Sequence, residues 1–500
     1  MSKIKRVALI EPKSPGYHVY SRIALPRLGL PLLGAMLKQR GIEVTVYCQE
    51  FEEIDYSDIL ASDLVGISST TSTVPEGYKI AQRVREAGIP VMMGGSHVSF
   101  MADEALQYAD YCVRGEGEHT LMELVNAIES GSGFGSINGL SYRVGDEMRH
   151  NPDRALLDDL DSLPFPDLSL IKGRDKIKLT PIATSRGCPH GCNFCSVIKM
   201  FGRGYRERSV ENVIDELQYL NPTNVFFYDD NFTAHRDRTK VLLETMLSKG
   251  VTPHWTAQSR IDVVQDKELL RLMKRSNCYI LYLGLESVNP ATLKEYNKKQ
   301  SVEEIVEAVR ILHENGIMAH GMFVFGAEND DVESLRSTVN FALRNHIDTV
   351  QFLVLTPLPG TQYFDEMERD GRLLTRDWHL YDGQHVVYQP TKMSPYELQK
   401  ETFKAMKRFY SISECVKMLF GLDFMRFACK VNLNLIRGRW DSARRQINGR
   451  MLKAFYRAYG HILIRRWEAA NKDFGERVNA LTQKARALRV KNQRSTEKAE

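Results

Sequence analysis

Residues 182–195 read Ile-Ala-Thr-Ser-Arg-Gly-Cys-Pro-His-Gly-Cys-Asn-Phe-Cys. A short apolar strand is followed directly by Cys188, Cys192 and Cys195, so that three of the chain's eight cysteines share one loop at C-x3-C-x2-C spacing. With this cysteine content, the probability that such a spacing occurs by chance somewhere in the chain is about two in a thousand. Thiolates suit iron–sulfur clusters or zinc. Three thiolates on a four-iron cube leave one iron open to a cofactor or substrate, whereas a zinc knuckle needs a distant fourth ligand.

The sequence on both sides of this loop alternates short apolar runs with helical stretches. In the segment 177–365 we expect six strands, at 182–184, 225–228, 254–258, 280–285, 319–325 and 350–355. The helix expected at Ser301–Asn315 begins with Ser-Val-Glu-Glu, a capping-box pattern. Six βα units predict a partial (β/α)6 barrel with its active site at the carboxyl ends of the strands.

Residues 1–135 show the same alternation, with five expected strands at 7–10, 44–47, 64–68, 91–93 and 111–114. Buried β-branched runs separated by helices are typical of a parallel sheet covered on both faces. We therefore predict an α/β, doubly wound, flavodoxin-like domain. Residues 136–176, which include Leu163-Pro-Phe-Pro166, have little periodicity and are expected to be a linker.

The C-terminal part is basic. Residues 401–500 contain 23 Lys and Arg against 9 Asp and Glu, although the net charge of the whole chain is only +4. We expect a cap at 366–410, with a strand-like patch at His385–Tyr388, and a basic helical region at 411–500. Interleaved basic and aromatic residues fit a membrane surface, a nucleic acid or a solvated helix face. No signal-peptide core or spanning segment is evident, which predicts a cytoplasmic protein, at most peripheral at the inner membrane face.

The cysteine loop, with Phe194 beside Cys195, resembles the signature of the radical S-adenosylmethionine superfamily. The resemblance implies a [4Fe-4S] cluster whose open iron binds S-adenosylmethionine and cleaves it reductively to a 5′-deoxyadenosyl radical. It also implies cofactor contacts at four places along the chain. These are Phe194 at adenine, Asp229 and Asp230 at the methionyl amino group, Gln258 and Arg260 at its carboxylate, and Glu286 and Ser287 at the ribose. A helix cap is the alternative role for the acidic pair, and a structural salt bridge is the alternative for Glu286.

A doubly wound domain before this barrel resembles the cobalamin-binding branch of the superfamily, on three loops that each follow a strand. Their expected cobalamin contacts are Ser68, Ser69, Thr70, Gly94, Gly95, Glu116 and Gly117. Ligands of open α/β sheets bind beyond the strand ends, and glycines there allow close backbone approach. The D-x-H-x-x-G motif that supplies an axial histidine is absent, and His18 lacks that context. A nucleotide-binding Rossmann-like domain is the alternative, but no G-x-G-x-x-G follows the first strand.

The aromatic segment 378–388 looks like the cap of the lipid- and tetrapyrrole-modifying enzymes of this branch, such as hopanoid methylases and anaerobic magnesium-protoporphyrin ester cyclases. Tyr381 and His385 are candidates for the substrate pocket, with simple packing as the alternative. We expect methylation of an unactivated carbon on a lipid-like or tetrapyrrole-like substrate, with oxidative cyclisation as the runner-up. A flavodoxin or ferredoxin is the expected electron donor. An RNA methylthiotransferase is disfavoured, because such relatives usually carry a second cysteine triplet in the N-terminal domain and only Cys48 and Cys112 occur there.

Overall fold

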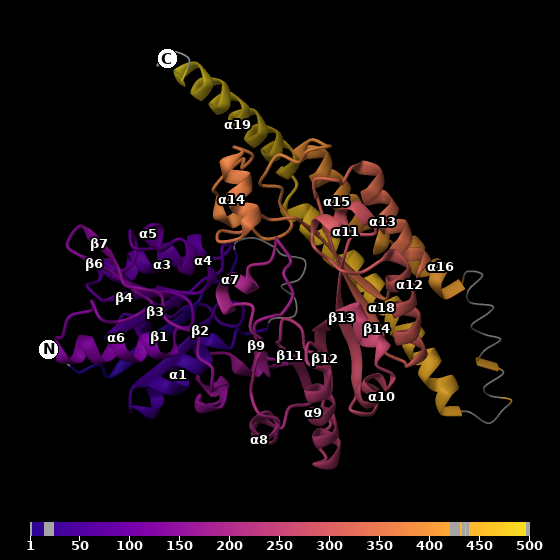
Figure 1. Ribbon diagram of the computed structural model, residues 1–500, viewed down its shortest axis with the longest axis horizontal. Coiled ribbons are helices and arrows are strands. Elements are labelled where there is room, and N and C mark those ends of the chain that lie inside the picture. The colour runs from indigo at the N-terminus through magenta and orange to yellow at the C-terminus, as the bar shows by residue number, and fades with distance from the viewer. Residues whose placement is uncertain (1–2, 15–24, 421–430, 433–435, 437–439, 497–500) are drawn as a thin grey trace.

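The computed structural model describes residues 3–14, 25–420, 431–432, 436 and 440–496. His18, Cys429 and most of the basic stretch 424–439 lie outside the described residues. Figure 1 shows an N-terminal α/β domain beside a second α/β domain, with one long C-terminal helix along the latter and the last helix turning back toward the N-terminal half.

The N-terminal sheet has five parallel strands in the order β2-β1-β3-β4-β5, which confirms the flavodoxin-like prediction. Their bounds are β1 Arg6–Glu11, β2 Glu43–Cys48, β3 Leu64–Ser68, β4 Val91–Gly94 and β5 Tyr111–Val113. The apolar sides of α1 (Gly29–Gln39) and α6 (Glu118–Ser130) share one core cluster with the sheet. The helix α3 (Val74–Glu86) belongs to the cluster on the other face, together with the shorter helices α2 (Tyr56–Ile59) and α5 (Ala102–Ala105).

The predicted linker contains regular structure that the sequence analysis missed. Strands β6 (Leu140–Val144) and β7 (Glu147–His150) form an antiparallel hairpin that continues the N-terminal sheet from β5. Ile171 also makes an isolated parallel bridge with Val46 of β2. The N-terminal unit therefore reaches beyond residue 135, and only part of 136–176 is irregular.

The second domain is a six-stranded parallel sheet in the order β15-β14-β13-β12-β11-β8, as expected for a partial barrel. The strands are β8 Thr180–Ile182, β11 Asn224–Phe227, β12 His254–Ser259, β13 Cys278–Glu286, β14 Met318–Phe325 and β15 Thr349–Val354. The helices between and after them are α8 Val210–Leu220, α9 Arg236–Ser248, α10 Lys267–Arg275, α11 Pro290–Glu295, α12 Val302–Glu314, α13 Val332–Arg344 and α14 Gln362–Arg369. The capping box predicted at Ser301 is present, because both reciprocal bonds with Glu304 form.

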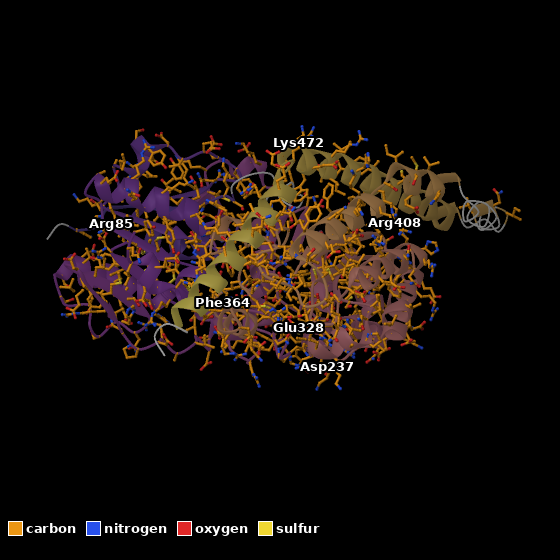
Figure 2. The ribbon with its side chains drawn as sticks, turned by 90° about the horizontal axis from the view of Figure 1, so that it is seen from above. Arg85, Asp237, Glu328, Phe364, Arg408 and Lys472 are labelled. Atoms are coloured by element: carbon orange, nitrogen blue, oxygen red, sulfur yellow. The ribbon has the colours of Figure 1, made fainter. Side chains whose placement is uncertain are left out.

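The described residues after the barrel include the helices α15 Pro395–Phe409, α16 Ile412–Phe420, α18 Trp440–Ala470 and α19 Phe474–Thr496. In Figure 2, α19 crosses the junction between the two α/β domains, and its Phe474 and Val478 belong to a core cluster with N-terminal residues. The strand-like patch expected at His385–Tyr388 is wrong: Tyr388 makes only an isolated bridge with Leu373. None of the helices in the described part is long and apolar enough to cross a bilayer.

Candidate functional site

The cysteine loop is closed at its base by a two-stranded ribbon. Strand β9 (Ser185–Arg186) pairs antiparallel with β10 (Arg206–Glu207), and the short helix α7 (Val197–Phe201) lies between them. Gly187 has φ +88°, and a Cβ there would lie 2.3 Å from the carbonyl oxygen of Gly204. Glycine is therefore required for the chain to turn into the loop.

The loop is anchored to the segment around α11 by three contacts. The ring of Phe194 meets Tyr296 edge to face, with centroids 4.8 Å apart. The Asn193 side chain donates to the carbonyl oxygen of Glu295 at 2.9 Å, and the Asn297 side chain donates to that of Gly191 at 2.9 Å. The Phe194 side chain thus holds the cysteine loop against the barrel, and the Phe194 backbone lies next to Cys195 in the chain.

The three cysteines are half-buried and lie among strand-end charges predicted from the sequence. Burial raises the pKa of Cys188, and the Asp230 carboxylate raises it further. Burial also raises the pKa of Cys192, on which Glu286 acts in the same direction and Lys298 and Arg260 in the opposite one. The cysteine loop and the ends of three different strands therefore converge, as a shared cofactor site requires.

The donor set fits the cluster that the sequence implies. A soft, positively charged cluster stabilises thiolates against the effect of burial, and a triplet of thiols in one loop supplies three ligands. In the described part of the chain, no three His, Cys, Asp or Glu side chains, the cysteine triplet included, are arranged as ligands of one metal ion. The isolated Cys48, Cys112, Cys278 and Cys415 are buried, as a lone cysteine usually is.

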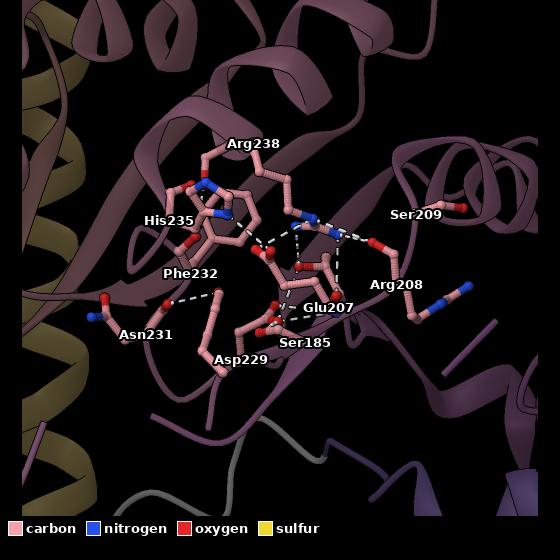
Figure 3. A network of polar contacts seen from close by, with 12 residues as sticks. Ser185, Glu207, Arg208, Ser209, Asp229, Asn231, Phe232, His235 and Arg238 are labelled. Carbon is pink, nitrogen blue, oxygen red and sulfur yellow. Dashed lines mark hydrogen bonds and ion pairs between the residues drawn. The ribbon is translucent and has the colours of Figure 1, made fainter. Parts of the chain in front are cut away.

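Asp229 and Asp230, the acidic pair after β11, have different surroundings. Figure 3 shows the buried polar contacts of Asp229. Asp229 is 1% exposed and accepts bonds from the Thr184 backbone at 3.1 Å, from the Thr184 hydroxyl at 3.0 Å and from the Ser185 hydroxyl. It therefore ties β11 to β8, and its expected role as a cofactor contact needs correction. Asp230 is exposed and lines the cavity described below.

The end of β12 carries the predicted Gln258 and Arg260. Both are half-buried, and the Arg260 side chain is 12% exposed. It pairs with the Asp262 carboxylate, with Nε and Oδ1 3.9 Å apart, and its buried Nε has no hydrogen-bond partner among the described residues. The guanidinium charge acts on Cys192 and His190, so this cation lies toward the cysteine loop.

The end of β13 is irregular at the predicted ribose element. The strand shifts register between Gly284 and Glu286, and Glu286 has φ +59°. Lys298 binds the Glu286 carboxylate at 2.8 Å, with both side chains 10% exposed or less. The Ser287 hydroxyl accepts from the backbone of Asn289 at 3.0 Å. The structural salt bridge, which the sequence analysis gave as the alternative role for Glu286, is thus present. The sequence analysis missed Lys298 as a site residue, because no motif around it indicates this role.

A cavity of about 430 Å³ lies between the strand ends of the N-terminal sheet and the barrel. On the N-terminal side it is lined by the predicted Ser68, Thr70, Gly94, Gly95, Glu116 and Gly117. Ser69 is fully buried behind this wall, so the prediction that it contacts a ligand needs correction. Gly95 has φ +95°, and a Cβ there would lie 2.5 Å from the Ser69 carbonyl oxygen, so this loop also requires glycine.

The opposite wall of the cavity includes residues that the sequence analysis passed over. Tyr228 and Asp230 directly follow β11, and Val197, Met200 and Phe201 belong to α7. The irregular segment before the barrel supplies Leu160, Leu163, Pro164 and Pro166. The apolar run Leu163-Pro-Phe-Pro166 within the predicted linker was the sequence signal that could have indicated a buried or ligand-lining role for this segment.

Glu116 is mainly a contact between domains. Its carboxylate, 6% exposed, binds Arg186 of β9 at 2.9 Å and Arg206 of β10 at 2.8 Å. Arg186 also binds Glu118 at 2.6 Å. Burial would raise the pKa of Glu116, but bonds from Arg206, the Leu157 backbone and Arg186 outweigh it and hold the pKa below its ordinary value. This cluster, here called the Glu116 clamp, fixes both strands at the base of the cysteine loop to the N-terminal domain.

Tyr381 and His385 take the packing role rather than the substrate-pocket role. The Tyr381 hydroxyl donates to the Thr375 carbonyl oxygen at 2.7 Å, and its ring packs on Trp378. His385 is 8% exposed, lies 2.8 Å from Asp382 and contacts the ring of Phe474, with centroids 4.1 Å apart. Both residues join the cap to neighbouring elements, and their assignment to the substrate pocket is corrected.

Comparisons with known proteins agree with these two domains. A B12 binding domain model matches residues 22–125, and a radical SAM superfamily model matches residues 182–341. An uncharacterized methyltransferase of Pyrococcus horikoshii is 33% identical over 405 residues, which cover 77% of this chain and 88% of that protein. The bacteriochlorophyllide d C-12(1)-methyltransferase of Chlorobaculum tepidum is 29% identical, covering 83% and 90%. Anaerobic magnesium-protoporphyrin IX monomethyl ester cyclases also match.

A solved structure has the same fold over most of both chains. The radical S-adenosylmethionine methyltransferase TsrM from Kitasatospora setae, with cobalamin and a [4Fe-4S] cluster bound, superimposes with a TM-score of 0.64. The identity is 20%, and the match covers 80% of this chain and 81% of that one.

Proposed function

Since the chain belongs to the radical S-adenosylmethionine superfamily and carries a B12-binding domain, we propose that it methylates a carbon atom of a tetrapyrrole-like or lipid-like substrate. When bound, the [4Fe-4S] cluster and S-adenosylmethionine supply the radical chemistry, and cobalamin supplies the methyl group. The observation that carries the proposal is the cavity of about 430 Å³ whose walls come from both cofactor domains. A substrate held there lies between the two reactive centres and away from bulk water.

We assign the residues around the cysteine loop as follows. Cys188, Cys192 and Cys195 hold three irons of the cluster. Asp230 accepts from the methionyl amino group, because its carboxylate is exposed to the cavity and its charge acts on Cys188. Arg260 pairs with the methionyl carboxylate, because an Arg guanidinium suits such bidentate recognition.

The remaining assignments concern the nucleoside and cobalamin. The backbone at Phe194 contacts adenine, Gln258 lies with Arg260 at the methionyl carboxylate, and Glu286 and Ser287 lie at the ribose. On the opposite wall, the backbone at Gly94, Gly95 and Gly117 approaches the corrin, because glycine leaves room for a flat, bulky macrocycle. The hydroxyls of Ser68 and Thr70 bind its polar groups.

The substrate class follows from the walls of the cavity. Leu163, Pro164 and Met200 line the cavity opposite the wall assigned to cobalamin, and they favour an apolar body over a charged one. Both a tetrapyrrole and a lipid satisfy this requirement. The tetrapyrrole methyltransferase among the relatives supports the first.

A membrane contact through the C-terminal helices would deliver an apolar substrate. On α18, Met451, Phe455, Tyr459 and Ile462 are 64%, 60%, 37% and 50% exposed and recur at helical spacing on one face. Arg465 and Arg466 are exposed on the same helix. An apolar stripe beside basic residues is typical of helices that lie on anionic lipid surfaces. Sedimentation with anionic vesicles tests this, and loss of binding in Phe455→Glu is expected.

The experiment for methyl transfer is anaerobic reconstitution with iron, sulfide and cobalamin, followed by assays with candidate tetrapyrroles and lipids. We expect the optical spectrum of bound cobalamin, 5′-deoxyadenosine, and a product heavier by one CH2. Loss of hydrogens without that gain supports the oxidative cyclisation that the cyclase relatives favour. Cys192→Ala should abolish cofactor cleavage, and purification with zinc in place of iron would overturn the proposal.

A further inference from the structure

A basic hollow lies on the barrel surface beside the cysteine loop. It has a volume of about 420 Å³ and is lined by the segment between α11 and α12, including Lys294, Lys298 and Lys299. Lys298 is paired with Glu286. Lys294 and Lys299 are exposed and make no ion pair within the part of the chain that the structure describes. The one acidic residue of the lining is Glu303, so the hollow is positively charged.

This hollow is joined directly to the loop that carries the cysteines. Asn297, which lines the hollow, donates to the backbone of Gly191 at 2.9 Å. Lys298 and Lys299 directly follow Asn297 in sequence and line the same hollow, so the hollow adjoins the cysteine loop. None of the three lysines lines the cavity between the domains.

Two parts of the cysteine loop face the N-terminal domain. The Glu116 clamp holds its base to the N-terminal domain, and α7 lines the cavity between the domains. Pro189 and Gly191, next to the hollow, are exposed. An electron must enter from outside, and the rate of electron transfer falls steeply with distance. The exposed tip of the loop beside the basic hollow is thus a surface at which an electron carrier can approach the cysteines.

We propose that Lys294 and Lys299, with the exposed loop tip at Pro189 and Gly191, form the docking surface for an acidic one-electron carrier protein. One electron leaves the flavin hydroquinone of a flavodoxin, which becomes the semiquinone, and reduces the [4Fe-4S]2+ cluster to [4Fe-4S]1+. The inference rests on the cluster assigned above but not on the identity of the substrate. Complementary charge speeds encounter and orients the partner.

The test is Lys294→Glu/Lys299→Glu in the reconstituted holoenzyme, with a reduced bacterial flavodoxin as the probe. We expect at least about a tenfold fall in the second-order rate of cluster reduction, with a weaker dependence on ionic strength. The dissociation constant for oxidised flavodoxin should rise, which needs no turnover to measure. Reduction by dithionite should keep its rate, because a small reductant needs no docking surface.

The matched control is Lys199→Glu/Arg203→Glu, which reverses two exposed charges at the other end of the same loop. We expect flavodoxin binding to be nearly unaffected there. Equal effects of the two double variants, or an effect of the control alone, would overturn the proposal. If Lys294→Glu/Lys299→Glu shows the expected loss against the control but the wild type methylates no substrate, the proposed function fails while the docking surface stands.

Discussion

At the scale of single residues, the acidic pair after β11 shows how neighbours in sequence acquire different roles. Successive side chains near a strand end point to opposite sides, so Tyr228 and Asp230 face the cavity while Asp229 faces β8. The sequence located the pair at the correct strand end. It could not distinguish Asp229 from Asp230, because Thr184 and Ser185, which bind Asp229, lie more than forty residues away in the chain.

Exchanging each carboxylate for an amide separates these roles. Asp229→Asn puts a donor where three bonds are accepted, and we expect a loss of about 1–3 kcal/mol in the free energy of unfolding. Asp230→Asn should stay within about 0.5 kcal/mol of the wild type but weaken S-adenosylmethionine binding. Urea denaturation and calorimetric titration measure the two effects. The opposite pattern would return the cofactor role to Asp229.

Gly95 offers a second test at this scale. Gly95→Ala forces a Cβ against the Ser69 backbone at φ +95°, whereas Gly88→Ala meets nothing within 4 Å at φ +80°. Both variants carry the strain of a positive φ, about 1 kcal/mol or more. Only the first should also lose cobalamin affinity, as followed by optical titration. Equal affinity in the two variants would show that the Gly95 loop does not approach the corrin.

At the scale of elements, apolar β-branched runs predicted all eleven parallel strands to within a few residues, because strands buried on both faces are marked by their own composition. The β6–β7 hairpin was missed although Gly145-Asp146 separates two short runs, a recognised hairpin signal. The patch His385–Tyr388 was misjudged for the opposite reason. Val386, Val387 and Tyr388 are fully buried, so their pattern reports burial between helices and not pairing in a sheet.

The open edge of the barrel is closed by a side chain that no local pattern identifies. The Tyr410 hydroxyl donates to the Val350 carbonyl oxygen at 2.7 Å and accepts from the Val350 backbone at 2.8 Å, both in the core. Tyr410→Phe leaves two buried backbone groups of β15 without a partner. We expect a loss of about 1–3 kcal/mol and faster amide exchange at Val350. Tyr219→Phe, on a side chain that is 72% exposed, is the neutral control.

At the scale of the whole molecule, the sequence predicted both domains and their cofactors but not the surface that joins them. Glu116 was assigned to cobalamin because it follows a strand of the first sheet. Its partners Arg186 and Arg206 lie 70 and 90 positions further along the chain. Pairings at such separation leave no periodic signal, so contacts between domains need a structure.

The Glu116 clamp is testable as a device that aligns the two cofactor domains. Glu116→Gln leaves the buried Arg206 without a carboxylate and Arg186 with Glu118 alone, and we expect a loss of about 3 kcal/mol and faster proteolysis between residues 151 and 178. Glu76→Gln, which breaks an exposed pair with Lys79, should cost less than about 1 kcal/mol. Because the folded-state pKa of Glu116 lies below its ordinary 4.5, the contribution of its charge is complete above pH 4.5 and is lost as the pH falls through the lowered value. The difference in stability between wild type and Glu116→Gln should therefore shrink below pH 4.5, and a difference that stays constant there would show that the charge of Glu116 does not hold the domains together.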